Sequence, residues 1–227
     1  MRSRAAGVAA VALLSACTGG SRHEPDPDTP AGAALSALVV AKEAAAADYR
    51  RTAFGPAWTD TDRNGCDTRN DVLRRDLTGV VLKADSHGCA VLSGVLHDPY
   101  TGTSVAFDRA HARVQVDHVV ALAEAWRSGA STWPYARLLA FANDPLELLV
   151  VSSAVNQAKG DSDAADWLPD KGTCAFAARQ VAVKRKYSLS VDSDERGALA
   201  KVLNSCPDQV LPAGGTPTLA PNRSPAP

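Results

Sequence analysis

Four side chains in two segments of the sequence are of the types that could hydrolyse a bond with a metal ion. Asp117 and His118 end a run in which polar and apolar residues alternate, and Asn156 and Lys159 follow a run of apolar residues. Aspartate and asparagine oxygens suit a hard cation such as Mg²⁺. A histidine left free of the metal could take a proton from water. If the chain folds back between the two segments, these residues predict a hydrolytic site.

Two strands and a helix must position these residues. The alternation over 113–117 has the period of a half-buried strand, and the apolar run 148–151 predicts a second strand. Ser152 and Ser153 supply N-cap chemistry for a short helix that carries the asparagine and the lysine. Further expected elements are helices at 31–51, 119–127, 173–186 and 194–204, strands at 80–83, 89–92 and 104–107, and a turn-rich stretch at 60–70. This order predicts an α+β fold.

Several fragments of the sequence, in this order, carry a family resemblance. They are Tyr49…Phe54-Gly55…Trp58, Asn64-Gly65-Cys66-Asp67-Thr68-Arg69-Asn70, Asp98-Pro99-Tyr100-Thr101-Gly102, Asp117-His118-Val119-Val120, Ala125-Trp126, Phe141-Ala142-Asn143-Asp144-Pro145, Asn156…Lys159-Gly160-Asp161 and Trp167-Leu168-Pro169. Together they resemble the HNH nucleases of the ββα-metal superfold. The similarity is greater to an exported HNH family related to the C-terminal domain of GmrSD-type restriction endonucleases. The resemblance implies a single α+β domain that contains a ββα-metal motif with flanking helices and short antiparallel strands.

The resemblance also implies roles for individual residues. His118 would be the general base that activates water against a phosphodiester, and Lys159 would lie close to the substrate phosphate. Asp117 and Asn156 would hold one divalent metal ion, Mg²⁺, with Mn²⁺ or Zn²⁺ as alternatives. The implied activity is a non-specific endonuclease that acts on nucleic acid, with DNA as the first expectation.

One position departs from the HNH pattern. The pattern has a central asparagine just before the second strand, which usually holds the loop that carries the histidine, and that position is Glu147 here. A glutamate in place of this asparagine would change the geometry of the loop that carries the histidine and would leave the predicted metal ligands unchanged. Asn143 could substitute for the asparagine, Glu147 could add negative charge near the metal, and Asp161 is a further supporting candidate.

Simpler interpretations compete with the nuclease. Asp117 could cap a helix, His118 could be a surface histidine, and Asn156 with Lys159 could form an exposed helix face. The alternative function is a non-catalytic binding module of the cell envelope that retains the HNH-like fold, and Glu147 favours it.

The charge balance limits how a nucleic acid could be held. The 227 residues include 24 Lys and Arg and 25 Asp and Glu, so no global positive field is expected. Affinity must then come from a local basic patch and must depend on salt. Arg69 and Arg137 fall inside family-like segments and are the expected phosphate contacts. No protein partner is inferred.

The N-terminal segment predicts export. Arg2 and Arg4 precede a short apolar run, and Leu14-Ser15-Ala16-Cys17 resembles the lipobox of bacterial lipoproteins. This predicts a signal peptide at 1–16, a lipidated Cys17 that anchors the chain to the membrane, and an extracytoplasmic location; an ordinary secretory signal is the alternative. The remaining boundaries are a flexible linker at 17–30, the domain at 31–206 and a disordered Pro-rich tail at 207–227.

The cysteines agree with export. Without Cys17, four remain, Cys66, Cys89, Cys174 and Cys206, which allow two disulfides in three possible pairings. We favour Cys66–Cys89 and Cys174–Cys206, because each pair brackets one compact stretch. Zinc is the rival interpretation, but the sequence has no CxxC and its spacings suit no common zinc finger.

Overall fold

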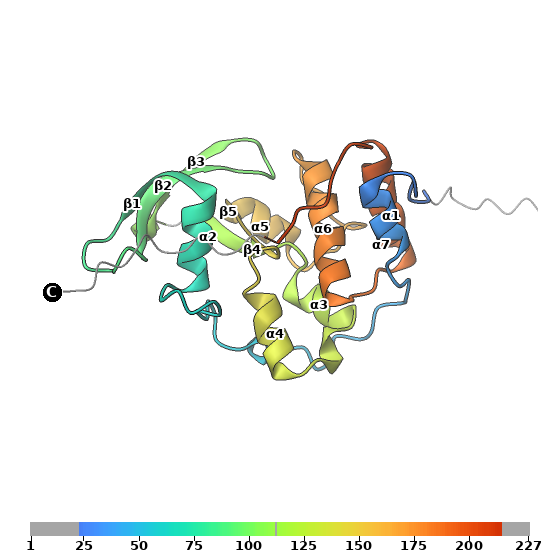
Figure 1. Cartoon of the computed structure of the whole chain (residues 1–227), viewed down its shortest axis with the longest axis horizontal. Helices are drawn as coiled ribbons and strands as arrows, with labels where there is room; N and C mark the ends of the chain where they lie inside the picture. The colour runs from blue at the N-terminus through green and yellow to red at the C-terminus, as the bar shows by residue number, and fades with distance from the viewer. Residues whose placement is uncertain (1–22, 112, 215–227) are drawn as a thin grey trace, which may run out of the picture.

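Two antiparallel sheets and two groups of helices make up the described residues, 23–111 and 113–214, of the computed structural model (Figure 1). The signal peptide at 1–16, Cys17 and parts of the predicted linker and tail lie outside these residues. The predicted α+β class is confirmed, and the described residues form a single domain.

The predicted strand–strand–helix unit is present in the middle of the molecule. It consists of β4 (Val114–His118), β5 (Leu148–Ser152) and α5 (Ser153–Lys159). β4 and β5 are antiparallel, with His118 opposite Leu148. Because successive strand residues point to opposite faces, Val114 and Val116 enter the core while Gln115 and Asp117 face α5.

A helix joins this unit to the second sheet. That sheet contains β1 (Leu77–Leu82), β2 (Val91–His97) and β3 (Ser104–Asp108) in the order β1-β2-β3, and α2 (Thr68–Asp76) contacts β2 as well as β4 and β5. Val72 and Leu73 of α2 share one core cluster with Val116 and Val150. The helix therefore fixes the position of the β4–β5 pair relative to the three-stranded sheet.

The helices on the other side of β4 and β5 form a second packed region. α1 (Pro30–Ser36), α6 (Thr173–Tyr187) and α7 (Ser193–Asn204) contact one another and lie together in Figure 1. α3 (Leu122–Arg127), α4 (Tyr135–Ala142) and the 3₁₀ turn at Arg51–Phe54 lie below these helices in Figure 1 and share a separate core cluster with α6. Shorter 3₁₀ turns occupy Arg109–His111 and Ala130–Thr132.

Both disulfides have the pairing that the sequence favoured. Cys66 is bonded to Cys89, which links the segment before α2 to the β1–β2 connection. Cys174 is bonded to Cys206, which links the start of α6 to the end of α7.

The helix predicted over 31–51 is wrong beyond Ser36. After α1 the chain runs extended, and the amide of Ala41 donates to the Val191 carbonyl while the amide of Ala44 donates to the Arg127 carbonyl. These bonds to distant carbonyls replace the helical ones, so tertiary contacts override the helix propensity of the alanines.

Other helix boundaries also differ from the prediction. The helix expected from residue 119 begins only at Leu122, because the amides of Val119 and Val120 both donate to Glu147. α2 begins inside the predicted turn-rich stretch, where the Asp67 side chain caps it by accepting from the Asn70 amide. α4 was not predicted.

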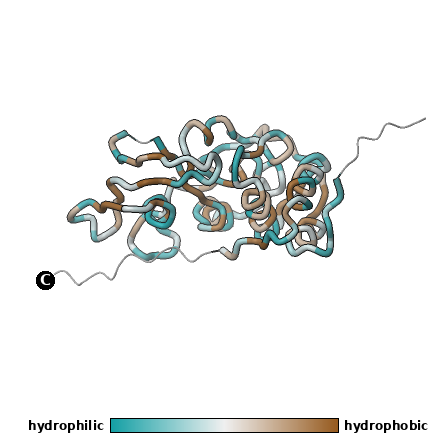
Figure 2. The backbone as a smooth tube through the Cα atoms, turned by 90° about the horizontal axis from the view of Figure 1, so that it is seen from above, coloured by the Kyte–Doolittle hydropathy of each residue, from teal (hydrophilic) through white to brown (hydrophobic). Residues whose placement is uncertain are grey.

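Hydrophobic and hydrophilic segments alternate along the backbone, as Figure 2 shows. Among residues 23–111 and 113–214 there is no helix with the length and apolar character needed to cross a membrane.

Candidate active site

Three of the four predicted site residues meet where β4 ends beside α5. Lys159, in the last turn of α5, places its Nζ 2.9 Å from Oδ1 of Asp117 and 2.8 Å from the carbonyl oxygen of His118. Asn156 lies one helical turn earlier and donates from Nδ2 to Oε1 of Gln115 at 2.7 Å. All four residues border one cavity of about 230 Å³.

The Asp117 carboxylate is buried and has a partner on each oxygen. Its Oδ2 accepts a hydrogen bond of 2.7 Å from the Tyr100 hydroxyl, while Oδ1 faces the Lys159 ammonium. Burial raises the pKa of Asp117, and the charge of Lys159 opposes that rise. Burial and the neighbouring Asp117 also raise the pKa of Tyr100, so the tyrosine keeps its proton and remains a donor.

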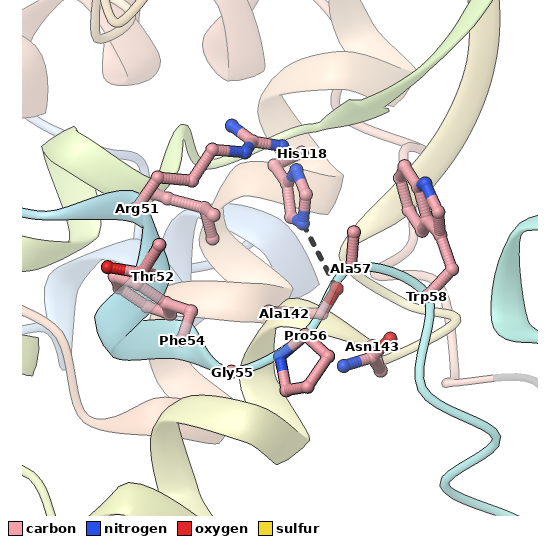
Figure 3. A pocket seen from close by; sticks show the side chains of 11 residues that line it. Arg51, Thr52, Phe54, Gly55, Pro56, Ala57, Trp58, His118, Ala142 and Asn143 are labelled. Atoms are coloured by element: carbon pink, nitrogen blue, oxygen red, sulfur yellow. Dashed lines mark hydrogen bonds between the residues drawn. The ribbon is translucent and has the colours of Figure 1, made fainter.

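His118 is held in one tautomer. Its Nε2 lies 3.0 Å from the carbonyl oxygen of Ala142, shown as the dashed line in Figure 3, and a carbonyl can only accept. Nε2 must therefore carry the proton, which leaves the lone pair on Nδ1. Burial, followed by the positive charge of Arg51, lowers the pKa of His118 to about 3, so the ring is neutral at pH 7.

A second cavity, of about 250 Å³, lies against the His118 ring. It is bordered by the 3₁₀ turn at Arg51–Phe54, by Trp58 and by Asn143 (Figure 3). The indole of Trp58 stacks on the imidazole, with ring centroids 6.0 Å apart and 14° between the planes. Arg51 borders both cavities, and in Figure 3 its guanidinium reaches toward the ring edge away from Ala142.

Glu147 holds the loop that follows His118. Its carbonyl oxygen accepts from the Val119 amide at 2.8 Å, and both carboxylate oxygens lie 3.2 Å from the Val120 amide. Glu147 is fully buried, and burial raises its pKa well above the usual value. The contact expected of the central HNH asparagine is therefore made by a glutamate. Asn143 instead donates to the Leu139 carbonyl, at the end of its own helix.

The other predicted residues lie outside both cavities. Asp161 accepts from Arg127 at 2.8 Å on the surface. Arg137 donates to the Tyr187 carbonyl and lies 4.5 Å from the centre of the Trp133 ring. Arg69 is half-buried near Arg109 and Asp67, and burial lowers its pKa.

Prediction from sequence missed Arg51 and Tyr100 as site residues. Both belong to segments that carry the family resemblance, but neither is close in sequence to Asp117.

The donor set fits a weakly ligated hard cation. In the part of the chain that the structure describes, no three His, Cys, Asp or Glu side chains are placed to hold a metal together. One carboxylate, from Asp117, and three side-chain amides, from Gln115, Asn156 and Gln157, border the cavity. The single carboxylate matches Mg²⁺, since this ion is bound through one or two carboxylates, several waters and substrate phosphates. Each oxygen of Asp117 already accepts one hydrogen bond and retains a second lone pair.

Comparison with known proteins places this site in a family. Residues 67–202 match the family described as GmrSD restriction endonucleases, C-terminal domain. The chain belongs to this family. The part shared with the GmrSD C-terminal domains contains β4, β5 and α5 and therefore all four site residues. An uncharacterized secreted protein of Arthroderma benhamiae is 38% identical over 207 residues, which cover 86% of this chain and 98% of that protein. No solved structure matches the chain.

Proposed function

We propose that this protein is a metal-dependent, non-specific endonuclease that hydrolyses phosphodiester bonds of nucleic acid, DNA first, outside the cytoplasm. The observation that carries the proposal is the hydrogen bond from Nε2 of His118 to the Ala142 carbonyl. It orients a neutral imidazole whose Nδ1 can accept a proton, as a general base must. The family relationship to GmrSD restriction endonucleases supports the same chemistry.

Each polar residue at the first cavity has a separate role in the proposed hydrolysis. Nδ1 of His118 takes the proton of the attacking water. Asp117 and Asn156 hold one divalent ion, Mg²⁺, with Mn²⁺ or Zn²⁺ as alternatives, which when bound stabilises negative charge on the phosphate and the leaving oxygen. Glu147 keeps the loop after His118 in place through the Val120 amide.

Positive charge comes from two residues that border the cavity. Lys159 uses two of its three donors on Asp117 and the His118 carbonyl, which leaves one for a phosphate oxygen. Arg51 borders both cavities, and we assign phosphate binding to it in place of Arg69 and Arg137.

Nicking of supercoiled plasmid by the purified chain tests this function. We expect nicking with Mg²⁺, none with EDTA, and a loss of activity in His118→Ala. His111→Ala is the matched control, because His111 is exposed and pairs with Asp108 on the surface. Activity that survives both EDTA and His118→Ala would refute the mechanism.

The second candidate is a non-catalytic envelope module, and one contact favours it. The buried Lys159 ammonium already neutralises Asp117, the residue that a metal would need. Wild-type protein that stays inactive with Mg²⁺, Mn²⁺ and Zn²⁺ would support this candidate.

The location outside the cytoplasm is part of the proposal. The description of the Arthroderma benhamiae relative as secreted and the two disulfides support export, because disulfides persist in oxidising compartments. For the lipid anchor, Cys17→Ser should move the protein from the membrane fraction to the medium. Retention of that variant at the membrane would contradict lipidation at Cys17.

A further inference from the structure

The segment 60–71, called here the loop at 60–71, runs into the first turn of α2 outside both cavities and carries oxygen-bearing side chains at a regular spacing. Counting Asp60 as position one, Asp62 is third, Asn64 fifth, Gly65 sixth and Asp71 twelfth. Calcium loops of the helix–loop–helix type place ligands at positions one, three, five and twelve and a glycine at six, with glutamate as the usual twelfth residue. The spacing alone occurs by chance too often to define a site.

The carboxylate of Asp71 provides an independent observation. Asp71 is only 3% exposed, its Oδ2 accepts a 3.0 Å hydrogen bond from Nδ2 of Asn64, and its Oδ1 is buried with no hydrogen-bond partner among the described residues. A buried carboxylate oxygen without a partner is destabilising unless a cation or a donor reaches it.

The carboxylate of Asp62 shares a partner with that of Asp71. Nδ2 of Asn64 also donates to Oδ2 of Asp62 at 3.0 Å, so one amide group stands between the carboxylates of Asp62 and Asp71. Burial raises the pKa of Asp71 to about 6, and the charges of Asp62 and Asp60 add to that rise, opposed by Arg74. This concentration of negative charge favours a bound cation.

The backbone of the loop curls around the side chain of Asp60. The side chain of Asp60 accepts from the amides of Asn64 and Gly65, and Oδ1 of Asn64 accepts from the Cys66 amide. Gly65 adopts φ 88°, a conformation that favours glycine. These bonds hold the loop closed, and the Cys66–Cys89 disulfide fixes its far end.

We propose that Asp60, Asp62, Asn64 and Asp71 bind one Ca²⁺ ion. In this structure the three carboxylates are not placed to hold an ion together. Calcium binding draws them together, pairs Oδ1 of Asp71 and turns the Asn64 side chain so that its Oδ1, instead of the donor Nδ2, faces the ion. Calcium fits better than magnesium because its coordination is flexible in number and geometry, whereas magnesium requires near-ideal octahedral placement.

Calcium at this loop also affects the candidate active site. Trp58, which stacks on His118, lies just before the loop, and Oγ1 of Thr68, the first residue of α2, donates to the Thr59 carbonyl at 2.6 Å. Ion binding therefore fixes the segment that carries Trp58. The calcium site does not depend on the proposed nuclease activity.

Calcium titration of the purified, disulfide-bonded chain tests the proposal. After treatment with EDTA and removal of the chelator, calorimetry with CaCl₂ should detect one ion per chain, with a Kd of about 10⁻⁵–10⁻³ M, the range of weak sensor and extracellular sites. The Tm should rise with Ca²⁺, because an ion that binds only the folded state stabilises it. An equal response to MgCl₂ would refute selectivity for calcium.

Single substitutions locate the ion. Asp62→Asn removes one carboxylate from an exposed position and should weaken calcium binding at least about tenfold. Asp85→Asn is the matched control, because Asp85 is exposed in the β1–β2 connection, and it should bind as wild type does. No heat and no Tm shift in wild type, or wild-type binding in Asp62→Asn, would overturn the proposal. His118→Ala should retain the full calcium response, so failure of the nuclease proposal would leave this result intact.

Discussion

Two buried aspartates, Asp117 and Asp71, differ in how their carboxylate charge is compensated. Asp117 has a partner on each oxygen, the Lys159 ammonium on one and the Tyr100 hydroxyl on the other. Asp71 has an amide on one oxygen and no hydrogen-bond partner within the described residues on the other. A buried charge is tolerated only when it is paired. The β4–β5–α5 region is thus organised by its own side chains, whereas the loop at 60–71 depends on a cation that the solvent supplies.

The comparison predicts that the two regions can be inactivated separately. His118→Ala removes the proposed general base, so nicking should fall by about 10²–10⁴-fold, while the calcium-dependent rise in Tm should stay as in wild type. Plasmid nicking under saturating Mg²⁺ and thermal unfolding with and without Ca²⁺ measure the two effects. A variant that lost both responses would show that the regions are not independent.

Removal of the internal counter-charge should make Asp117 resemble Asp71. Lys159→Met leaves a buried carboxylate without its cation, which costs about 3–5 kcal/mol of unfolding free energy. Added Mg²⁺ should restore part of this loss, since the ion can then pair with Asp117. Urea unfolding in EDTA and in Mg²⁺ measures both values.

The double variant Lys159→Met/Asp117→Asn is the control for that experiment. It removes the uncompensated charge, so it should be more stable than Lys159→Met alone and should no longer respond to Mg²⁺. A single variant that loses less than about 1 kcal/mol would mean that the ion pair is energetically neutral, as exposed pairs often are.

Local patterns in the sequence predicted the part of the site that lies on consecutive residues. The alternation at 113–117 and the apolar run at 148–151 both became strands, and antiparallel pairing of these strands then required α5 to approach Asp117. The disulfides were predictable for a similar reason, because each closes a separate stretch of chain.

The partners of these residues could not be predicted from local patterns. Tyr100 donates to Asp117 from the β2–β3 connection, and Arg51 approaches His118 from a 3₁₀ turn, so their placement depends on tertiary packing. The extended run after Ser36 has the same cause, since its amides bond to carbonyls near α3 and before α7. The calcium-loop spacing at 60–71 is visible in the sequence. Only the structure shows that Oδ1 of Asp71 is buried without a hydrogen-bond partner, which is the observation that supports a cation site there.

A smaller effect is expected where Glu147 replaces the HNH asparagine. Glu147→Gln keeps an oxygen acceptor for the Val120 amide and should behave nearly as wild type. Glu147→Leu leaves that buried amide without an acceptor, at a cost of about 1–3 kcal/mol. Because the loop positions His118, kcat should fall more than KM changes. If both variants are equally active, the glutamate does not position the loop.

In a third buried cluster one lysine pairs with two carboxylates, so the negative charge is only partly compensated. Nζ of Lys184 contacts Glu124 at 2.6 Å and Glu195 at 2.9 Å, and all three side chains are buried. Burial raises the pKa of Glu195 to about 8, with Lys184 opposing the rise and Glu124 and Asp163 adding to it. The folded protein therefore keeps a proton that the unfolded chain releases near pH 4.5.

This proton makes part of the stability dependent on pH. The contribution is complete below about pH 4.5 and is lost as the pH rises toward 8, because the unfolded state then binds fewer protons than the folded state. Glu195→Gln cannot titrate, so its stability relative to wild type should increase by at least about 1 kcal/mol between pH 5 and pH 8. Urea unfolding of both proteins across this range, in EDTA, measures the difference. A constant difference would mean that Lys184 keeps both carboxylates ionised.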